Sequence, residues 1–395
     1  MEAKSKHLWG QYEKTTFKIH IDSFQGSRSN ESRLETINAL SFLPFRGTIK
    51  MSNPEQDFKL FEEWAWDAMV TGAEHPLRYY FGRQLGGASR DLIKKYDLKK
   101  RRYINTTSMD SELALITANI ALAGPGKLFY DPFVGTGSFP IACAEFGAIN
   151  WGSDIDGRAA RGEYTKMQGK GKSRAEMSLK GNFEQYGLLA GLGDMFTADL
   201  TNSPVRRHPF GKGGPGGRSR LFDGIICDPP YGVREGLRVL GCRDADKKPW
   251  VVEAGMERYR ESNFIAPKKP YSFHAMLDDI LAFAAEALVD RGRLSFWMPT
   301  ANDQDQEIAV PGHPCLELVS VCTQPFNKWS RRLITYRRRP DEAVSQEDLV
   351  SWKTSAERGH EGVTADELNP FRKGYFNKFA TKKKPQQVQA EGNPL

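Results

Sequence analysis

An apolar run that ends in an acidic, proline-containing turn is the feature that most constrains the fold of this chain. Residues 221–227 read LFDGIIC, and Asp228, Pro229, Pro230 and Tyr231 follow at once. A short apolar run of this kind is typical of a strand buried on both faces of a sheet. The two prolines end the strand and stiffen the loop after it. The sequence therefore predicts a buried sheet with a rigid polar loop at the end of one strand.

Strands and helices are expected to alternate on both sides of that loop. The expected strands are residues 127–130, 148–153, 195–198, 293–298, 316–322 and 333–337, and the expected helices are 109–122, 138–146 and 271–289. This alternation predicts an α/β fold, a mostly parallel sheet with helices on both faces.

The beginning of the chain follows a different pattern, that of a small α+β region. Strands are expected at 17–21 and 47–51, and helices at 32–42 and at the aromatic-rich stretch 56–69. So short a region is marginal as an independent domain.

Composition divides the chain into four parts. We expect the α+β region at 1–78, a basic linker at 79–104, the α/β domain at 105–340 and a polar basic tail at 341–395. The tail and a Gly/Arg-rich insert at 205–220 lack the apolar residues of a core, so we predict that both are largely disordered.

A glycine turn, residues 131–137 (DPFVGTG), follows the expected strand 127–130. Glycines at a strand-to-helix junction let backbone N–H groups approach a ligand, and the helix N-terminus adds partial positive charge. The turn lacks the Gly-Lys-Ser/Thr of a phosphate-binding loop. Because Asp131 would repel a diphosphate, the pattern favours a ligand with a cationic head, such as S-adenosylmethionine. A plain strand-to-helix turn is the alternative.

Two further acidic residues close the next expected strands. Asp154, followed by Ile155 and Asp156, stands where a nucleotide ribose would be held. Asp156 is alternatively the cap of the following helix. Asp199 is placed to accept from an adenine amino group, but an aspartate at a strand end is as readily a turn residue.

The loop after residues 221–227 has the chemistry of an amine-binding site. A carboxylate and a prolyl carbonyl are both acceptors, and together they can bind the two hydrogens of a planar amine. Tyr231 offers a π-face to a base taken out of its stack. An accidental turn is the alternative.

Composition argues against several classes of protein. The five cysteines form no Cys-x-x-Cys pair and the seven histidines are scattered, so we expect no metal site and a cytoplasmic protein with reduced thiols. We find no apolar run long enough to cross a membrane and no secretory signal. We expect His274 and His313 to be structural, and Cys315 and Cys322 to lie in the core. A net charge of +7 and the basic run from Lys328 to Arg339 favour a polyanionic partner.

Taken together, these motifs resemble the eukaryotic tRNA (guanine-10) exocyclic-amine methyltransferase catalytic subunit of the THUMP type. The matching stretches are INTTSMD, DPFVGTG, WGSDID, FDGIICDPPYGVRE, HPCLELVS and SRRLIT. The resemblance implies a Rossmann-like methyltransferase fold with a seven-stranded sheet whose last strand is antiparallel. It also implies S-adenosylmethionine as cofactor, N2-methylguanosine at position 10 of tRNA as product, a tRNA-binding THUMP domain and a small zinc-binding activator protein as partner.

The resemblance also implies residue roles. The methionine end of the cofactor would lie against Asp131, Gly135 and Gly137, the ribose against Asp154, the adenine against Asp199 and guanine against residues 228–231. Phe133, Thr136, Ile155 and Thr107 complete the expected cofactor-binding set. Family members carry a ferredoxin-like domain before THUMP, whereas residues 17–69 look like the later part of THUMP, so a truncated THUMP-like region is expected.

Other functions stay open at this point. They are methylation of another tRNA guanine, methylation of a DNA adenine amine and, from a different class, RNA binding by a non-catalytic relic of the fold. A protein-glutamine methyltransferase ranks lower, because it would more typically carry Asn in place of Asp228. The intact glycine turn and the intact residues 228–231 argue against the relic.

Overall fold

A computed structural model describes residues 2–158, 177–205, 220–241, 266–302, 307–357 and 364–380. The chain divides into two compact units, residues 1–90 and 91–395. Most of the expected Gly/Arg-rich insert, residues 206–219, and Cys242 lie outside the described residues. In the described part of the chain, we find no helix with both the length and the apolar character needed to cross a bilayer.

The first unit is built on a three-stranded sheet of order β1-β2-β3. Strand β1 (Phe17–Phe24) pairs in parallel with β2 (Gln56–Glu63), which pairs antiparallel with β3 (Arg78–Arg83). The helices of this unit are α1 (Glu2–Trp9), η1 (Gly10–Tyr12), α2 (Asn30–Asn38) and α3 (Ala68–Thr71).

The helix predicted for residues 56–69 is wrong, because residues 56–63 form strand β2. Phe58, Leu60 and Glu62 are buried on one face of the sheet, while Phe61, between Leu60 and Glu62, is 47% exposed. This alternation is the period of a strand, and the high aromatic content hid it. The strand predicted at 47–51 is reduced to an isolated bridge between Phe17 and Ile49. All of β3 except Arg78 falls within the predicted linker 79–104.

The second unit is built on a seven-stranded sheet of order β11-β12-β10-β7-β4-β5-β6. Strand β12 runs antiparallel to β10 and β11, and the other neighbouring strands are parallel. This topology confirms the predicted Rossmann-like sheet with an antiparallel last strand. The strands are β4 (Leu128–Asp131), β5 (Ile149–Asp154), β6 (Leu192–Thr197), β7 (Phe222–Cys227), β10 (Leu288–Ala301), β11 (Leu316–Pro325) and β12 (Trp329–Arg338).

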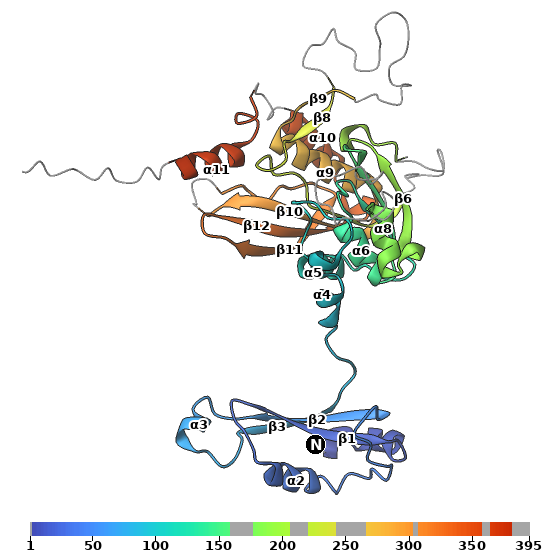
Figure 1. Ribbon diagram of the computed structural model, residues 1–395, viewed down its shortest axis with the longest axis vertical. Coiled ribbons are helices and arrows are strands. Elements are labelled where there is room, and N and C mark those ends of the chain that lie inside the picture. Colours follow the sequence, from blue (N-terminus) through green and yellow to red (C-terminus); the bar gives the residue numbers. More distant parts are fainter. Residues whose placement is uncertain are drawn as a thin grey trace, which may run out of the picture. The chain divides into compact units, whose positions relative to one another are not determined.

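Helices cover both faces of this sheet, as predicted. Along β7, Ile225 and Cys227 belong to a buried cluster with α9 (Phe273–Ala287), whereas Ile226 belongs to a second cluster. The second cluster contains α5 (Ser111–Ile120), α6 (Ser138–Glu145) and α8 (Leu179–Tyr186). Helices α9 and α5 accordingly lie on opposite sides of the strands (Figure 1).

Shorter elements complete the second unit. They are α4 (Asp91–Lys95), η2 (Leu98–Lys100), η3 (Leu189–Gly191), η4 (Leu200–Asn202), η8 (Asp341–Ala343) and an antiparallel ribbon of β8 (Arg238–Leu240) and β9 (Lys268–Pro270).

The tail that we predicted to be largely disordered contains helical segments. Residues 346–357 form α10 (Gln346–Glu357), and residues 370–380 form α11 (Pro370–Ala380). Phe371 is 6% exposed and joins the buried cluster of α9. Phe371 thus packs into the core of the second unit, a burial that the polar composition of the tail did not predict.

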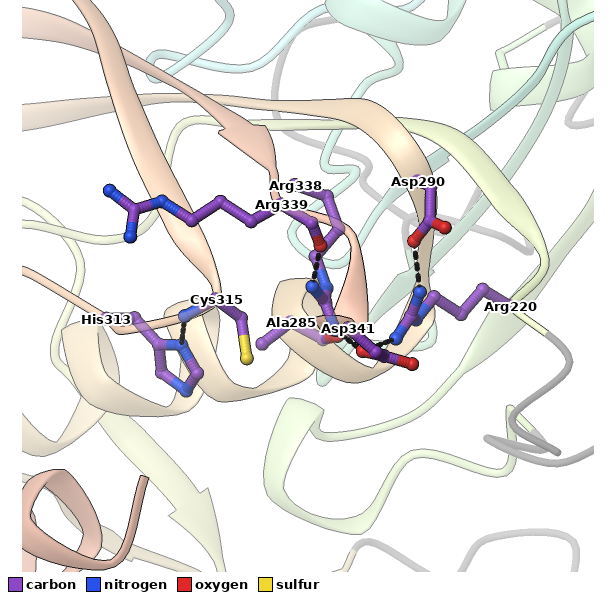
Figure 2. Close-up of polar contacts among 8 residues, drawn as sticks. All are labelled: Arg220, Ala285, Asp290, His313, Cys315, Arg338, Arg339 and Asp341. Carbon is purple, nitrogen blue, oxygen red and sulfur yellow. Dashed lines mark hydrogen bonds and ion pairs between the residues drawn. The ribbon is translucent and has the colours of Figure 1, made fainter. Parts of the chain in front are cut away.

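An ion-pair network fixes the beginning of this tail (Figure 2). The Arg338 side chain, 1% exposed, donates to the Ala285 carbonyl at 2.8 Å and to Asp341 at 2.7 Å. Asp341 also pairs with Arg220, which pairs with Asp290.

His313 is buried and its Nδ1 accepts from the Cys315 amide at 3.0 Å, which is the structural role expected. Burial and the charge of Arg338 lower the pKa of His313 to about 4.

Of the two cysteines predicted to lie in the core, the prediction for Cys322 is wrong. Cys315 is buried, but Cys322 is exposed. Cys322 lies on β11, which is an edge strand of the sheet, and several neighbouring β11 side chains are also exposed. An apolar strand pattern does not reveal which strand is at the edge.

Candidate active site

The loop of residues 228–231, which we call the DPPY loop, leaves the carboxyl end of β7 in the centre of the sheet. The Tyr231 hydroxyl donates a 2.6 Å hydrogen bond to Oδ1 of Asp228. The Tyr231 ring meets the ring of Trp329, at the start of β12, with centroids 6.3 Å apart. The loop therefore holds a carboxylate and an aromatic face in one fixed arrangement.

The environment of Asp228 shifts its titration. Burial raises the pKa of Asp228 to about 6, opposed by the Tyr231 hydrogen bond and by the charge of Arg331. A buried carboxylate with a pKa near neutrality is a common mark of a functional site. Asp228 is thus an acceptor at pH 7 that can still take up a proton.

The glycine turn lies beside the DPPY loop, because β4 and β7 are neighbours. The turn needs left-handed backbone at Gly135 (φ 48°) and Gly137 (φ 80°), a conformation that glycine adopts without strain. Gly137 is the N-cap residue of α6. The Asp131 carboxylate accepts from the amide of Phe133 at 2.9 Å.

Asp154 connects the end of β5 to the glycine turn. Its carboxylate accepts from the amides of Gly135 at 3.0 Å and of Asp156 at 2.8 Å. Asp156 accepts from the amide of Arg158, two residues on, as a cap or turn residue does. Ile155, between the two aspartates, is half-buried.

Three of the predicted site residues interact electrostatically. Burial raises the pKa of Asp131 well above its usual range, and the charges of Asp154 and Asp228 raise it further. Burial also raises the pKa of Asp154. Carboxylates that raise one another's pKa are stabilised by a cation placed among them.

Two threonines near the glycine turn lie in contact with neighbouring loops. The Thr136 and Ser108 hydroxyls are 2.7 Å apart, and Thr107 donates to Glu235 at 2.8 Å. Glu235 follows the DPPY loop, and its charge raises the pKa of Asp228. Phe133 packs against the buried cluster of α9.

Asp199 has the geometry of a turn residue. It is 5% exposed and is the N-cap residue of η4, where it accepts from the amide of Thr201 at 3.2 Å and from its hydroxyl at 2.9 Å. It also accepts from the amide of Leu240 at 2.9 Å. These three bonds are made by the carboxylate that the resemblance assigns to adenine.

Relatives of known name match almost the whole chain. The tRNA (guanine(10)-N(2))-methyltransferase of Saccharomyces cerevisiae is 40% identical over 93% of this chain and 78% of its own length. The tRNA (guanine(10)-N(2))-methyltransferase TRMT11 of Homo sapiens is 35% identical over 92% of this chain and 74% of its own length. This chain belongs to the tRNA (guanine(10)-N2)-methyltransferase family.

Two further comparisons accompany this match to the tRNA (guanine(10)-N2)-methyltransferase family. Residues 1–90 match the family described as Tmrp11 THUMP N-terminal domain. Among solved structures, TrmN from Thermus thermophilus is 16% identical and covers 85% of this chain and 77% of its own, with a TM-score of 0.35.

In this member of the tRNA (guanine(10)-N2)-methyltransferase family, the basic run from Lys328 to Arg339 is partly buried. Arg332 and Arg338 are 5% and 1% exposed, and each pairs with a carboxylate. Arg331 lies over the ring of Trp297 at 4.8 Å and donates to Gln324 at 2.6 Å. The run is therefore not a uniformly solvated face that presents every arginine to a phosphate.

Sequence reasoning missed the residues that contact the main chain of the DPPY loop. Asn369 and Arg372, from the predicted disordered tail, donate to the carbonyls of Tyr231 and Gly232. The available signal was Asn369-Pro370 before an aromatic-rich stretch, a typical helix start. No group of three or more His, Cys, Asp or Glu side chains arranged to hold a metal occurs among the described residues.

Proposed function

We propose that this chain is an S-adenosylmethionine-dependent tRNA methyltransferase that forms N2-methylguanosine at position 10 of tRNA. The observation that carries the proposal is the DPPY loop, with Asp228 and Tyr231 joined at 2.6 Å, beside a glycine turn in a member of this family. The two named relatives have this activity in their names.

The glycine turn fits S-adenosylmethionine. A Cβ at Gly135 would meet only the Phe133 carbonyl, at 3.9 Å, so free space lies beside the backbone there. The acidic surroundings of Asp131 suit the ammonium and sulfonium charges. We assign the methionine end to Asp131, Phe133, Gly135, Thr136 and Gly137, the ribose to Asp154 and Ile155, with Thr107 nearby. The Asp199 carboxylate already accepts three hydrogen bonds, so about one acceptor position is left for the adenine amine.

When bound, S-adenosylmethionine supplies an electrophilic methyl group. The chain orients the nucleophile: the Asp228 carboxylate and the Pro229 carbonyl accept the two hydrogens of the guanine amine. Pro230 stiffens the loop, and the Tyr231 ring stacks on the base. Because an aryl amine is a weak base, its proton leaves late, and Asp228 is the acceptor. Holding the reacting groups in place is then the main contribution to the rate.

Methyl transfer from labelled S-adenosylmethionine to unmodified tRNA tests this function. A tRNA with adenine at position 10 is the control. Label in the first tRNA and none in the second is the expected result. Equal label in both would move the site to another tRNA nucleotide. No label in either, with a DNA substrate labelled instead, would favour the DNA adenine amine.

We also propose that a small zinc-binding activator protein is the partner of this chain, as the family resemblance implies. Co-expression with that protein, followed by size-exclusion chromatography, tests it, and separate elution would count against the pair. Cys143, Cys227, Cys315 and Cys322 form no disulfide within the part of the chain that the structure describes. This supports a reducing compartment, and we place the protein in the cytoplasm.

A further inference from the structure

We propose that Asn369 is a positioning residue for methyl transfer, because it holds the main chain of the DPPY loop from the 364–380 segment. This inference rests on the proposed function. Asn369 is 1% exposed, and its Nδ2 donates to the Tyr231 carbonyl at 2.9 Å. A buried amide that makes this bond restricts the residue whose ring is assigned to the target base.

The same side chain begins helix α11. Its Oδ1 accepts from the amide of Arg372 at 3.0 Å, and its carbonyl accepts from the amide of Lys373 at 3.1 Å. These are the bonds of an N-cap residue, and Pro370 occupies the first helical position, where it is favoured. One side chain therefore joins the start of a helix to the catalytic loop.

A second contact reaches the next residue of the loop. Arg372 Nη1 donates to the Gly232 carbonyl at 2.5 Å, and its Nε donates to Asp366 at 2.7 Å. Two consecutive carbonyls, those of Tyr231 and Gly232, are thus bound by side chains of one segment.

Gly232 is shaped for this contact. Its φ is 78°, and a Cβ there would lie 2.3 Å from Nδ2 of Asn369. Only glycine allows both the left-handed backbone and the close approach of the amide. The loop and the segment are therefore fitted to each other, beyond a single hydrogen bond.

The aromatic side of the loop has the same support. The Trp329 ring meets Tyr231 at 6.3 Å and Phe371, at the start of α11, at 5.8 Å. Helix α11 also contacts β10 (Figure 1). Strand β10 pairs in parallel with β7, the strand that the DPPY loop follows. Side chains of the segment thus bind the main chain of the loop, and Phe371 is linked to Tyr231 through edge-to-face contacts with Trp329.

These contacts complete the rigidity of the loop. Pro229 and Pro230 restrict the backbone before Tyr231, but Gly232 after it is intrinsically the most flexible residue. Asn369 and Arg372 bind the carbonyls where the prolines no longer act. Small misplacements of a reacting group reduce the rate strongly, so loss of this contact reduces turnover rather than cofactor binding.

Asn369→Asp is the sharpest test. Aspartate has the same shape and remains a good N-cap, but it replaces the donor to the Tyr231 carbonyl by an acceptor. Asn369→Ser also keeps a capping residue and is too short to reach the carbonyl. Lys373→Ala is the matched control, since Lys373 is an exposed residue of α11.

For both Asn369 variants we expect kcat at saturating tRNA to fall about 10- to 100-fold. The S-adenosylmethionine Kd should stay within about twofold, because the glycine turn is untouched. Hydrogen exchange of the amides that follow the loop, from residue 232 onward, should become faster. Lys373→Ala should match wild type in each measurement.

Wild-type kcat or unchanged loop exchange in Asn369→Asp and Asn369→Ser would overturn the inference and leave Asn369 as a helix cap alone. An equal loss of cofactor affinity would overturn it too, because it would indicate general unfolding. An inactive wild-type enzyme would instead count against the proposed function.

Discussion

The Tyr231 hydroxyl donates a 2.6 Å hydrogen bond to the Asp228 carboxylate, which directly joins the aromatic and the acidic side chain of the DPPY loop. The phenol donates, so its hydrogen bond stabilises the ionised form of Asp228 and lowers its pKa, against the larger effect of burial. Burial raises the pKa of Tyr231 well above its usual range, and the charge of Asp228 and this hydrogen bond raise it further. At pH 7 the pair is therefore a neutral phenol bound to a carboxylate.

Removal of the Asp228 carboxylate should abolish turnover. We expect Asp228→Ala to lose about 10³-fold or more in kcat, because neither amine orientation nor proton uptake remains. Cofactor affinity, measured by calorimetry, should stay within a few-fold of wild type. Asp194→Ala, which removes an exposed carboxylate on β6, is the control. Wild-type-like turnover in Asp228→Ala would exclude the assigned role.

Tyr231→Phe should move the acid limb of the pH–rate profile. Wild-type kcat should fall as pH drops through about 6, where Asp228 takes up a proton. The phenylalanine ring still stacks, but the hydrogen bond that lowers the Asp228 pKa is gone, so the limb should shift to higher pH. A profile of kcat from pH 5 to 9 measures it. An unmoved limb would show that Asp228 does not control the rate.

Asp228→Asn should lower the activity of the protein but raise its stability at alkaline pH. Folding raises the pKa of the Asp228 carboxyl from 3.8 to about 6. The stability that the protonated carboxyl contributes is therefore fully present below pH 3.8 and is lost as pH rises through 6. Above that pH the buried charge destabilises the fold by at most about 3 kcal/mol. Thermal unfolding should therefore show a higher Tm for Asp228→Asn at pH 8 and little difference at pH 4. A lower Tm at pH 8 would contradict this.

The central sheet and the two loops at its carboxyl edge were predictable because their signals are local. The glycine turn and the DPPY loop each combine an apolar strand with the residues that end it, in a single short stretch. Helix α9 likewise shows its apolar face directly in the sequence. These elements form where the local pattern and the tertiary burial agree.

The errors arose where burial depends on distant residues. Residues 56–63 are a strand because β1 and β3 flank them, and Cys322 is exposed because β11 has a neighbour on one side only. Asn369 is buried because the core of the α9 cluster accepts Phe371. No window of sequence around Asn369 contains Tyr231, so its contact with the DPPY loop could not be predicted.

Gly137→Ala should weaken both the fold and the cofactor site. Its φ of 80° is strained for alanine, and the new Cβ would lie 3.1 Å from Cγ of Leu179. Left-handed backbone costs about 1–2 kcal/mol for a non-glycine residue. Gly187→Ala is the matched control, because its φ is 70° and its Cβ would meet nothing within 4 Å. Urea unfolding should show a larger loss for Gly137→Ala, and only that variant should lose cofactor affinity.

Arg338→Ala should destabilise the second unit, residues 91–395, without a direct effect on turnover. Its loss leaves the buried Ala285 carbonyl without the 2.8 Å donor and removes the 2.7 Å bond to Asp341. Each buried acceptor left unpaired costs about 1–3 kcal/mol. Arg337→Ala is the neighbouring control, since its pair with Glu317 is exposed and such pairs contribute about 1 kcal/mol or less.

Arg338 closes β12 at the end opposite to Trp329, which contacts Tyr231. Below its unfolding temperature, Arg338→Ala should therefore keep a kcat close to that of wild type, while urea unfolding shows a clearly lower midpoint. Equal midpoints for Arg338→Ala and Arg337→Ala would show that the network in Figure 2 does not stabilise the fold. A large loss of kcat with unchanged stability would instead place Arg338 in the catalytic or tRNA-binding machinery.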